Sequence, residues 1–458
     1  MTTSQNFAIC EVNTVPNSHT DLTQGSIRRQ LIRYAVPIVI SSLLQALYGV
    51  ADMLIVSRFL GDVGASAVNN ASQITRFATQ VVIGLSSGGG VLIGQFFGAR
   101  EHEKQDRAIG TFFTCFALLG LAVSVLLGIF SRTILSALRA PALEDANSYL
   151  FVCAMGMFFV FGYNMLSSVL RALGNSKTPL YCIIVATVLN VILDIIFVGK
   201  LGLGTAGAAL ATIIAQAGAF FGALLYLLRR RELFSFSAAA FRPDTAIAKR
   251  IFAIGAPAAV QMSIASLSWL TVTYLINDYG IAYSAANGIA AKIRDFPHIF
   301  ISSMNIGTAA IIAQTLGAEK FDRARDVMYT AMRMSLLITA ASIVVVELTA
   351  PFLAAIFIDD PLVINIAARN LRIEIIGEMF YASFLIYHSL MMGAGHSHMA
   401  LISSFVNCIV FRFVLALLFN ALWGINGIFL ACAVAPASSI PVGLYYTRSN
   451  KWRRTLAR

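Results

Sequence analysis

Residues 190–216, NVILDIIFVGKLGLGTAGAALATIIAQ, place Asn190, Asp194 and Thr212 in an apolar stretch that is interrupted by glycines. Asn190 and Asp194 are four residues apart, so they share one face of a helix. The segment GLGTAG at 202–207 ends that helix and lets the chain reverse. Because a helix rises about 1.5 Å per residue, Asp194 and Thr212 lie within about 10 Å of the same end of the helix pair. The stretch therefore predicts an acid, an amide and a hydroxyl at one depth.

The composition indicates that the chain is a membrane protein, so these three side chains lie inside a bilayer. The chain has 458 residues, of which 58% are hydrophobic and 12% are charged, whereas a soluble domain has about 25% charged residues. Apolar stretches of about 20 residues, long enough to span a bilayer, recur from Tyr34 to Tyr446. An aspartate at the centre of a membrane helix costs about 2.5–3.5 kcal/mol. Asp194 therefore needs a proton, a bound cation or a buried partner.

Cysteine spacing and the distribution of charge exclude two other classes. The six cysteines form no CxxC pair and five lie in apolar stretches, so we expect no disulfide framework and no metal site. The net charge of +11 is scattered in short clusters between apolar stretches. This arrangement is explained by membrane topology, and we expect no nucleic-acid partner.

The apolar pattern predicts an all-α membrane protein with twelve transmembrane helices. Most Lys and Arg residues fall in segments that are cytoplasmic if both termini are cytoplasmic, as the positive-inside rule requires. The predicted helices are 31–57, 66–98, 108–131, 148–170, 180–198, 205–228, 250–277, 284–316, 328–350, 362–392, 399–419 and 424–446. The predicted domains are an N-terminal segment (1–30), a six-helix lobe (31–228), a linker (229–249), a second six-helix lobe (250–446) and a basic tail (447–458).

The two predicted lobes are an internal repeat with a period of about 220 residues. Pro37 matches Pro257, and GQFFGAREHEKQDRA at 94–108 resembles AQTLGAEKFDRARDV at 313–327. Further matching pairs are Pro141 and Pro361, Gly174 and Gly395, and Gly207 and Gly427. Each half has an even number of helices, so both have the same orientation. The repeat predicts a pseudo-twofold axis along the membrane normal with a cavity between the lobes.

These features together resemble a known transporter family. The segments are P…LLQALYGVADMLIVSRFLG, LRALGNSKTPL, NVILDIIFVGKLGLGTAGAALAT and IFIDDPLVINIAARNLRI. In this order and spacing they are similar to multidrug and toxic compound extrusion (MATE) transporters, and most of all to the bacterial DinF-like branch. The resemblance implies a cation-coupled antiporter that exports amphipathic organic cations by alternating access through one central cavity.

The resemblance also implies a cation-coupling cluster in the N-terminal half. The family's motif positions are occupied here by Asp52, Asn164, Asn190, Asp194 and Thr212. A related branch carries an acid on helix 7, where this chain has QMSIASLSW at 261–269 and no carboxylate. By residue count Asp52 lies at the depth of Asp194 and Thr212, whereas Asn164 lies deeper. Two carboxylates that face one pocket raise each other's proton affinity. The pair would hold a proton or accept Na⁺; we expect H⁺ rather than Na⁺ and no other cofactor. The alternative is a purely structural hydrogen-bond cluster.

Prolines and buried charges add further candidates. Pro37 and Pro257 are candidate hinges, with a proline tolerated in the first turn of each helix as the alternative. Glu378 is expected to pair with Arg412 or to contact a cationic substrate, and Glu374 is expected near the outer surface. Arg76 and Arg294 occupy matching places in the repeat, where gating or snorkelling would explain them.

Two aromatic segments are candidates for the substrate cavity. They are MGMFFVFGYNM at 155–165 and EMFYASFLIYHSLMM at 378–392. Aromatic faces attract organic cations and methionine adapts to varied shapes. The candidate cavity residues are Phe158, Tyr163, Glu378, Met379 and Tyr381.

The sequence thus predicts a secondary transporter of the bacterial inner membrane that functions as a monomer. No G-x-x-x-x-G-K-[ST] motif is present, so ATP is not expected to drive transport directly. One alternative is a flippase for a lipid-linked oligosaccharide or another lipid, which would have a basic cavity. The other is a membrane-embedded enzyme, but no nucleophile–base pair supports it and we expect no enzymatic activity.

Overall fold

The computed structural model describes residues 21–230, 232–236 and 240–454, and every regular element in these ranges is helical. The N-terminal half contains α1 (Ile27–Gly98), α2 (His102–Ala137), α3 (Leu143–Ala172), α4 (Lys177–Asp194), the π-helix η1 (Ile195–Lys200) and α5 (Gly204–Arg229). The C-terminal half contains α6 (Thr245–Asn277), α7 (Ile281–Gly317), α8 (Phe321–Ala355), α9 (Pro361–Gly393), α10 (Ser397–Phe405), the π-helix η2 (Val406–Phe411), α11 (Arg412–Trp423), α12 (Ile425–Val434), η3 (Ala435–Ser438), α13 (Ser439–Arg448) and η4 (Lys451–Arg453).

The helix α1 contains the first two predicted membrane spans. It bends at Gly61, whose φ of 64° and ψ of −164° are not helical and suit glycine. The predicted gap at 58–65 is therefore wrong, because the chain turns at a single residue. Eleven apolar helical segments of the described chain are long enough to cross a membrane. Since α1 holds two spans, the all-α fold with twelve spans is confirmed.

Several predicted segment boundaries shift by a few residues. The first helix begins at Ile27, so only residues before it remain in the N-terminal segment. Between α5 and α6 the linker runs from 230 to 244. Residues 1–20 of the predicted N-terminal segment and 455–458 of the predicted tail lie outside the described residues.

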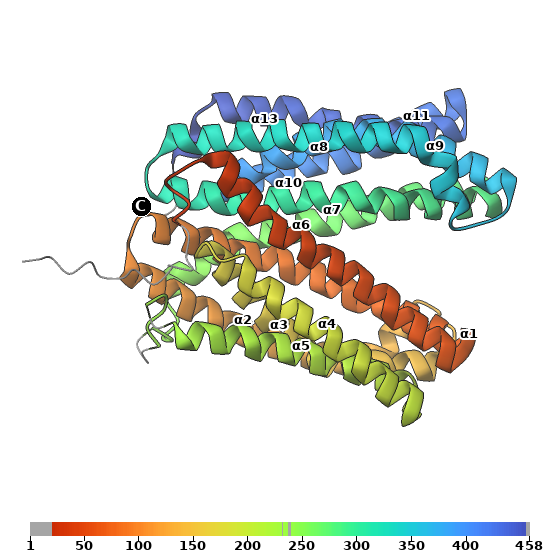
Figure 1. Cartoon of the computed structure of the whole chain (residues 1–458), viewed down its shortest axis with the longest axis horizontal. Coiled ribbons are helices and arrows are strands. Elements are labelled where there is room, and N and C mark those ends of the chain that lie inside the picture. Colours follow the sequence, from red (N-terminus) through yellow and green to blue (C-terminus); the bar gives the residue numbers. More distant parts are fainter. Residues whose placement is uncertain (1–20, 231, 237–239, 455–458) are drawn as a thin grey trace, which may run out of the picture.

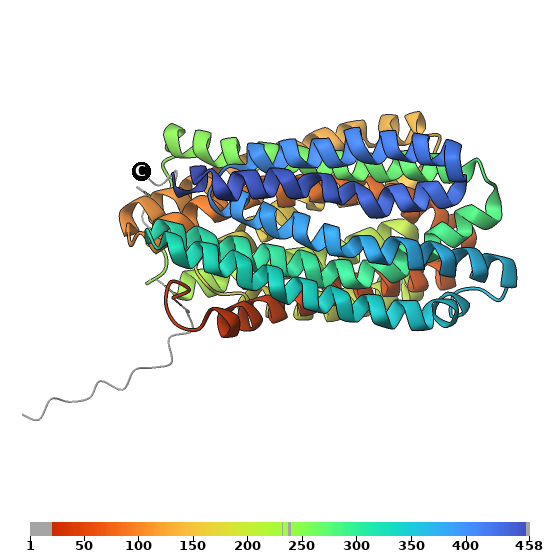
Figure 2. The ribbon, with the colours of Figure 1, turned by 90° about the horizontal axis from the view of Figure 1, so that it is seen from above.

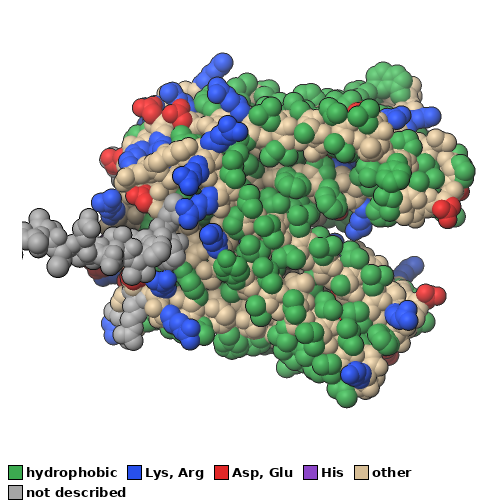
Figure 3. Space-filling view, in the orientation of Figure 1, with side chains coloured by type: hydrophobic (Ala, Val, Ile, Leu, Met, Phe, Trp, Pro, Cys, Tyr) green, Lys and Arg blue, Asp and Glu red, His purple; other side chains and the backbone are tan. Residues whose placement is uncertain are grey.

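The helices form two lobes, one from α1–α5 and one from α6–α13 (Figure 1). The long helices run along the length of the molecule, as the view from above also shows (Figure 2). The lobes meet at one end and separate at the other, where the surface is hollowed into a cleft (Figure 3). Leu22 and Trp452, close to the two ends of the described chain, are buried in one core cluster. Both ends of the described chain therefore lie at the same end of the molecule, which is the closed one (Figure 1).

At the closed end the N-terminal part of one helix from each lobe packs into the core of the other lobe. Leu31 and Tyr34 of α1 belong to a core cluster formed mainly by α7, α8 and α9. Ile247 and Ile251 of α6 belong to the main core of the N-terminal lobe. This exchange joins the lobes where they meet.

Two buried glutamines seal the closed end with reciprocal hydrogen bonds. Gln95 Nε2 donates to the carbonyl oxygen of Gly393 at 2.9 Å, and Gln314 Nε2 donates to that of Ala172 at 2.6 Å. Both glutamines are 0% exposed and occupy equivalent places in the sequence repeat. The repeat thus produces two matching contacts between the lobes.

A pair of glycines makes the same seal tight. A Cβ atom on Gly98 would overlap the carbonyl oxygen of Gln314, and a Cβ on Gly317 would overlap that of Gln95. Glycine is therefore required at both positions of the repeat for this close approach.

The two candidate hinge prolines lie inside their helices. The helix α1 begins ten residues before Pro37, and α6 begins twelve residues before Pro257. The first-turn alternative is therefore wrong for both. Each proline removes one backbone hydrogen bond within a long helix, which is a condition for a hinge. The hinge role itself stays a prediction.

Candidate functional site

The acidic pair predicted from the sequence is brought together inside the N-terminal lobe. Asp52 of α1 is 8% exposed, and Asp194 at the end of α4 is 0% exposed. The two carboxyl groups lie within hydrogen-bonding reach of each other. A hydrogen bond between two carboxyl groups needs one proton on the pair. One shared proton would allow the two carboxyl groups to form this bond.

The predicted amide and hydroxyl complete this cluster. The amide of Asn190, oriented to satisfy both of its ends, donates to Asp194 Oδ2 at 2.9 Å and accepts from the backbone N–H of Thr212 at 3.2 Å. The hydroxyl of Tyr48, four residues before Asp52, lies 3.0 Å from Thr212 Oγ1. Helices α1, α4 and α5 thus meet at one polar site.

Neither aspartate has a basic partner. Among residues 21–230, 232–236 and 240–454, no Lys, Arg or His forms an ion pair with Asp52 or Asp194. The Oδ1 atoms of both are buried without a hydrogen-bond partner. A buried carboxylate left in this way is costly unless it binds a proton or a metal cation. The site thus has the chemistry of an exchangeable cation site.

One predicted residue, Asn164, has no described contact with the acidic pair, so its role in coupling stays a prediction, and the structure adds three residues near the pair. Asn164 donates to the carbonyl of Val160 in its own helix at 2.8 Å, and nothing places its amide at the acidic pair. The structure adds Tyr48, and also Tyr149 and Cys153 of α3, which lie near enough to Asp52 to interact electrostatically. Both spacings, Tyr48 to Asp52 and Tyr149 to Cys153, are four residues. The first spacing places Tyr48 on the helix face of Asp52 and was an available signal for Tyr48 alone.

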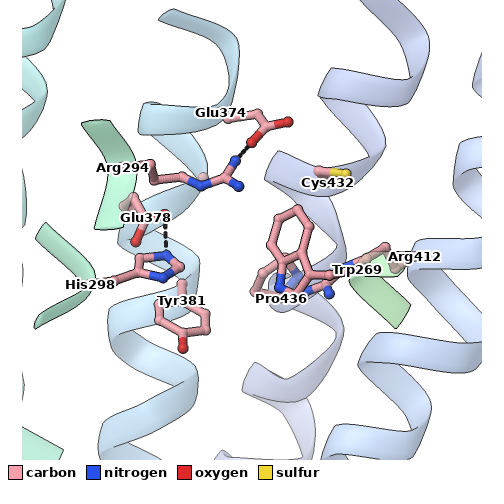
Figure 4. Close-up of a pocket in the computed structure, with 10 residues that line it drawn as sticks. Trp269, Arg294, His298, Glu374, Glu378, Tyr381, Arg412, Cys432 and Pro436 are labelled. Carbon is pink, nitrogen blue, oxygen red and sulfur yellow. Dashed lines mark hydrogen bonds and ion pairs between the residues drawn. The ribbon is translucent and has the colours of Figure 1, made fainter. Parts of the chain in front are cut away.

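A second buried polar cluster lies in the C-terminal lobe and has a different charge pattern (Figure 4). Arg294 forms an ion pair with Glu374, and His298 Nε2 lies 2.7 Å from Glu378 Oε1. The predicted pairing of Glu378 with Arg412 is therefore wrong. Glu374 is only 4% exposed, so its predicted solvation near the outer surface is wrong as well.

An indole ring separates the two arginines of this cluster. The Cζ atoms of Arg294 and Arg412 each lie 4.5 Å from the ring centroid of Trp269. A cation over an aromatic face gains about 0.5–2 kcal/mol. The imidazole of His298 stacks on Tyr381 with 4.4 Å between ring centroids. Aromatic rings thus cover three of the charged or titratable groups.

The candidate cavity residues do not form one stripe. Tyr163 is buried in the core of the N-terminal lobe, where its hydroxyl donates to the carbonyl of Pro179 at 3.1 Å. Phe158 packs against Phe220 of α5. Tyr381 and Glu378 instead line the pocket of the C-terminal lobe, and Met379 is half-buried on the same helix. The prediction that Tyr163 lines the cavity is wrong, because its side chain is buried in the core of the N-terminal lobe.

Comparisons with known proteins agree with this architecture. The family model MatE matches residues 37–196 and 257–418, once in each half of the chain. The protein named "Probable multidrug resistance protein YoeA" of Bacillus subtilis is 28% identical over 81% of this chain and 82% of its own length. "Multidrug export protein MepA" of Staphylococcus saprophyticus is 25% identical over 90% of this chain and 91% of its own length.

Solved structures show the same fold. A crystal structure of MATE in the bent conformation superposes with a TM-score of 0.89 at 21% identity, covering 94% of this chain and 96% of that one. An outward-facing multidrug resistance MATE transporter of the MOP superfamily gives a TM-score of 0.87 at 21% identity, covering 94% and 97%. With twelve spans, two lobes and a family match in each half, the chain belongs to the MatE family of multidrug efflux transporters.

Proposed function

We propose that this transporter is an antiporter that exports amphipathic organic cations and is driven by a cation bound at Asp52 and Asp194. The observation that carries the proposal is the buried pair of carboxyl groups without a basic partner. The names of the relatives, which describe multidrug resistance and export, support organic compounds as substrates.

We propose H⁺ rather than Na⁺ as the coupling ion. The two carboxyl groups lie within hydrogen-bonding reach, and one shared proton satisfies both. A sodium ion would need a cage of several oxygen ligands. Among the described residues of the site, the Oδ1 atoms of Asp52 and Asp194 lack a hydrogen-bond partner, whereas Thr212 Oγ1 is bonded to Tyr48 and the Asn190 amide to Asp194 and to backbone. Two free oxygens are fewer than such a cage needs.

The closed end is proposed to face the cytoplasm. Lys and Arg side chains gather over this end of the molecule (Figure 3), as the positive-inside rule predicts for a cytoplasmic surface. Both termini of the described chain are there too. In the bacterial inner membrane the cleft would then open outward, and the structure would be the state that releases substrate.

The proposed cycle requires that binding of the coupling ion weakens binding of the substrate, and the reverse. In the inward-facing state the charged pair favours an organic cation in the cavity. In the outward-facing state a proton at Asp52 and Asp194 neutralises the pair and promotes release. Return to the inward-facing state carries the proton to the cytoplasm. Linkage requires that each ligand weakens the binding of the other by the same factor.

The test uses purified protein in liposomes and a fluorescent organic cation, with a pH gradient and a Na⁺ gradient imposed separately. We expect the pH gradient to drive transport by wild type and by Asp62→Asn, an exposed aspartate ten residues beyond Asp52 in α1. The variant Asp52→Asn should lose the response to the gradient. Transport driven only by Na⁺ would overturn proton coupling, and a full response in Asp52→Asn would overturn the site.

A further inference from the structure

Arg412 is the basic group of the C-terminal cluster that has no acidic partner. Its side chain is 3% exposed in the middle of the chain's apolar helices. Both nearby carboxylates already have a basic partner, since Glu374 pairs with Arg294 and Glu378 pairs with His298. Among the residues that the structure describes, no carboxylate oxygen lies within 4.0 Å of the Arg412 guanidinium.

The polar contacts of Arg412 leave part of its guanidinium unused. Its Nη1 lies 3.4 Å from the hydroxyl of Ser268, which itself donates to the carbonyl of Cys408 at 2.7 Å. Its Nε has no hydrogen-bond partner among the described residues. The Trp269 ring faces the guanidinium carbon but accepts no such bond in the plane of the group. A guanidinium offers planar donors that match a carboxylate.

A second unpartnered group lies on the same helix. Asn407 is 1% exposed, and neither its Oδ1 nor its Nδ2 has a hydrogen-bond partner among the described residues. Asn407 is the second residue of η2 and lies five residues before Arg412. The backbone N–H of Arg412 donates to the carbonyl of Asn407 across this π-helical turn. Asn407 therefore lies one turn before Arg412, outside the residues that line the pocket.

The pocket beside Arg412 has space for a small group. It is lined by Arg412 and by half-buried Trp269, His298 and Tyr381, and also by Arg294, Glu374 and Glu378, the members of the two ion pairs. Its volume of about 20 Å³ exceeds the roughly 10–15 Å³ that one water-sized atom occupies. One oxygen or ion of that size therefore fits beside Arg412, where an organic body does not.

We propose that Arg412 binds a monovalent anionic group, with a carboxylate of a zwitterionic substrate or a free chloride ion as its two sources. The anion supplies the charge that Arg412 lacks and the acceptor that its Nε lacks. The inference rests on the proposed function where the anionic group belongs to an exported compound. It adds to that function a class of substrate that carries one positive and one negative charge.

The test measures binding of two dyes to the full chain purified in detergent. Rhodamine 19 carries a free carboxylate, and rhodamine 6G is its ethyl ester with the same cationic ring system. Fluorescence polarisation gives the affinity of each dye for wild type, Arg412→Gln and Arg412→Lys. Arg372→Gln is the matched control, because Arg372 lies on α9 and pairs with Glu347 at 3.7 Å in a partly exposed position.

Arg412→Gln is expected to weaken binding of rhodamine 19 by about tenfold, the loss of a charge-assisted hydrogen bond, and to leave rhodamine 6G within about twofold. Arg412→Lys should lie between the two, and Arg372→Gln should match wild type. Retained binding of rhodamine 6G shows that the variant is folded. Equal weakening of both dyes, or no change in either, would overturn a carboxylate at Arg412.

A chloride arm separates the two sources. Chloride is exchanged for gluconate at constant ionic strength in the same binding experiment. Competition of chloride with rhodamine 19 in wild type but not in Arg412→Gln would support the anion site with free chloride as its occupant. If neither dye discrimination nor chloride competition depends on Arg412, the inference is wrong. Transport of rhodamine 6G by Arg412→Gln would leave the proposed antiport untouched in that case.

Discussion

The two lobes share a fold but differ in the charge they bury. The N-terminal lobe buries Asp52 and Asp194 with no basic partner, whereas the C-terminal lobe pairs Glu374 and Glu378 with basic residues and keeps Arg412 in excess. In both lobes a π-helix adjoins the unpaired charge, η1 after Asp194 and η2 before Arg412. The two halves of the repeat thus share a helical frame, while the buried charge without a partner among the described residues is acidic in one lobe and basic in the other.

The largest loss of stability is expected in the C-terminal lobe, whose buried carboxylates are paired with basic residues. Glu374→Ala leaves the buried Arg294 without its partner and should lower the free energy of unfolding by about 3–5 kcal/mol. Thermal unfolding in detergent measures this loss. Glu347→Ala is the control, because its pair with Arg372 is partly exposed and is worth about 1 kcal/mol or less. Equal losses in the two variants would show that the buried pair is not a structural requirement.

Coupling should be lost in one lobe and kept in the other. Asp194→Asn removes one of the two exchangeable carboxyl groups, so the ratio of gradient-driven to undriven dye transport should fall toward one. Glu378→Gln keeps a hydrogen-bond acceptor for His298 and should leave that ratio unchanged. Liposome transport assays at fixed dye concentration give both ratios. A larger loss in Glu378→Gln would move the coupling site to the C-terminal lobe.

The hydrogen bonds at the closed end should matter in both lobes. Gln95→Leu and Gln314→Leu each remove one hydrogen bond between the lobes and leave a buried carbonyl unpaired, at a cost of about 1–3 kcal/mol. Gln314→Leu also removes the bond that Gln314 Oε1 accepts from the backbone N–H of Leu22 at 3.3 Å, so its effect should be the larger. Each should shift the population away from the cleft-open state. Spin labels at exposed positions 62 and 278, in a cysteine-depleted background, report the separation of the lobes. A shift in one variant alone would show that the two contacts are not equivalent.

The smallest effect is expected at the rim of the acidic site. Tyr48→Phe removes the hydroxyl that lies 3.0 Å from Thr212 Oγ1, a contact worth about 0.5–1.5 kcal/mol. Transport should persist with a modest change in its pH dependence, measured by dye efflux between pH 6 and pH 8. Complete loss of transport would place Tyr48 in the coupling step itself.

The sequence was most informative where the signal is local. Asn190 and Asp194 share a helix face, and the glycine bend after them sets the depth of Thr212, so their meeting could be predicted from spacing. Asp52 was placed by its depth and by the family resemblance. Tyr149 and Cys153 were missed because they come from α3, at a distance in sequence that no local pattern spans.

The C-terminal cluster was harder to predict for the same reason. The partner of Glu374 is Arg294 on α7, which lies eighty residues earlier in the chain. Around Glu374 the helix α9 has one exposed face, which carries Arg372 and Ile376, but charged and apolar residues occur on both faces, so hydrophobicity alone does not place the acid. Apolar length and repeated prolines and glycines predicted the twelve spans, because these depend on the membrane and not on side-chain partners.

The most direct test of the central claim is the number of protons released when an organic cation binds. Purified protein in a weakly buffered detergent solution is mixed with rhodamine 6G, and a pH indicator reports the release. If the organic cation weakens proton binding at Asp52 and Asp194, the wild type should release about one proton when the dye binds. The double variant Asp52→Asn, Asp194→Asn should bind the dye and release none. The same release from both proteins, at equal dye occupancy, would contradict the account.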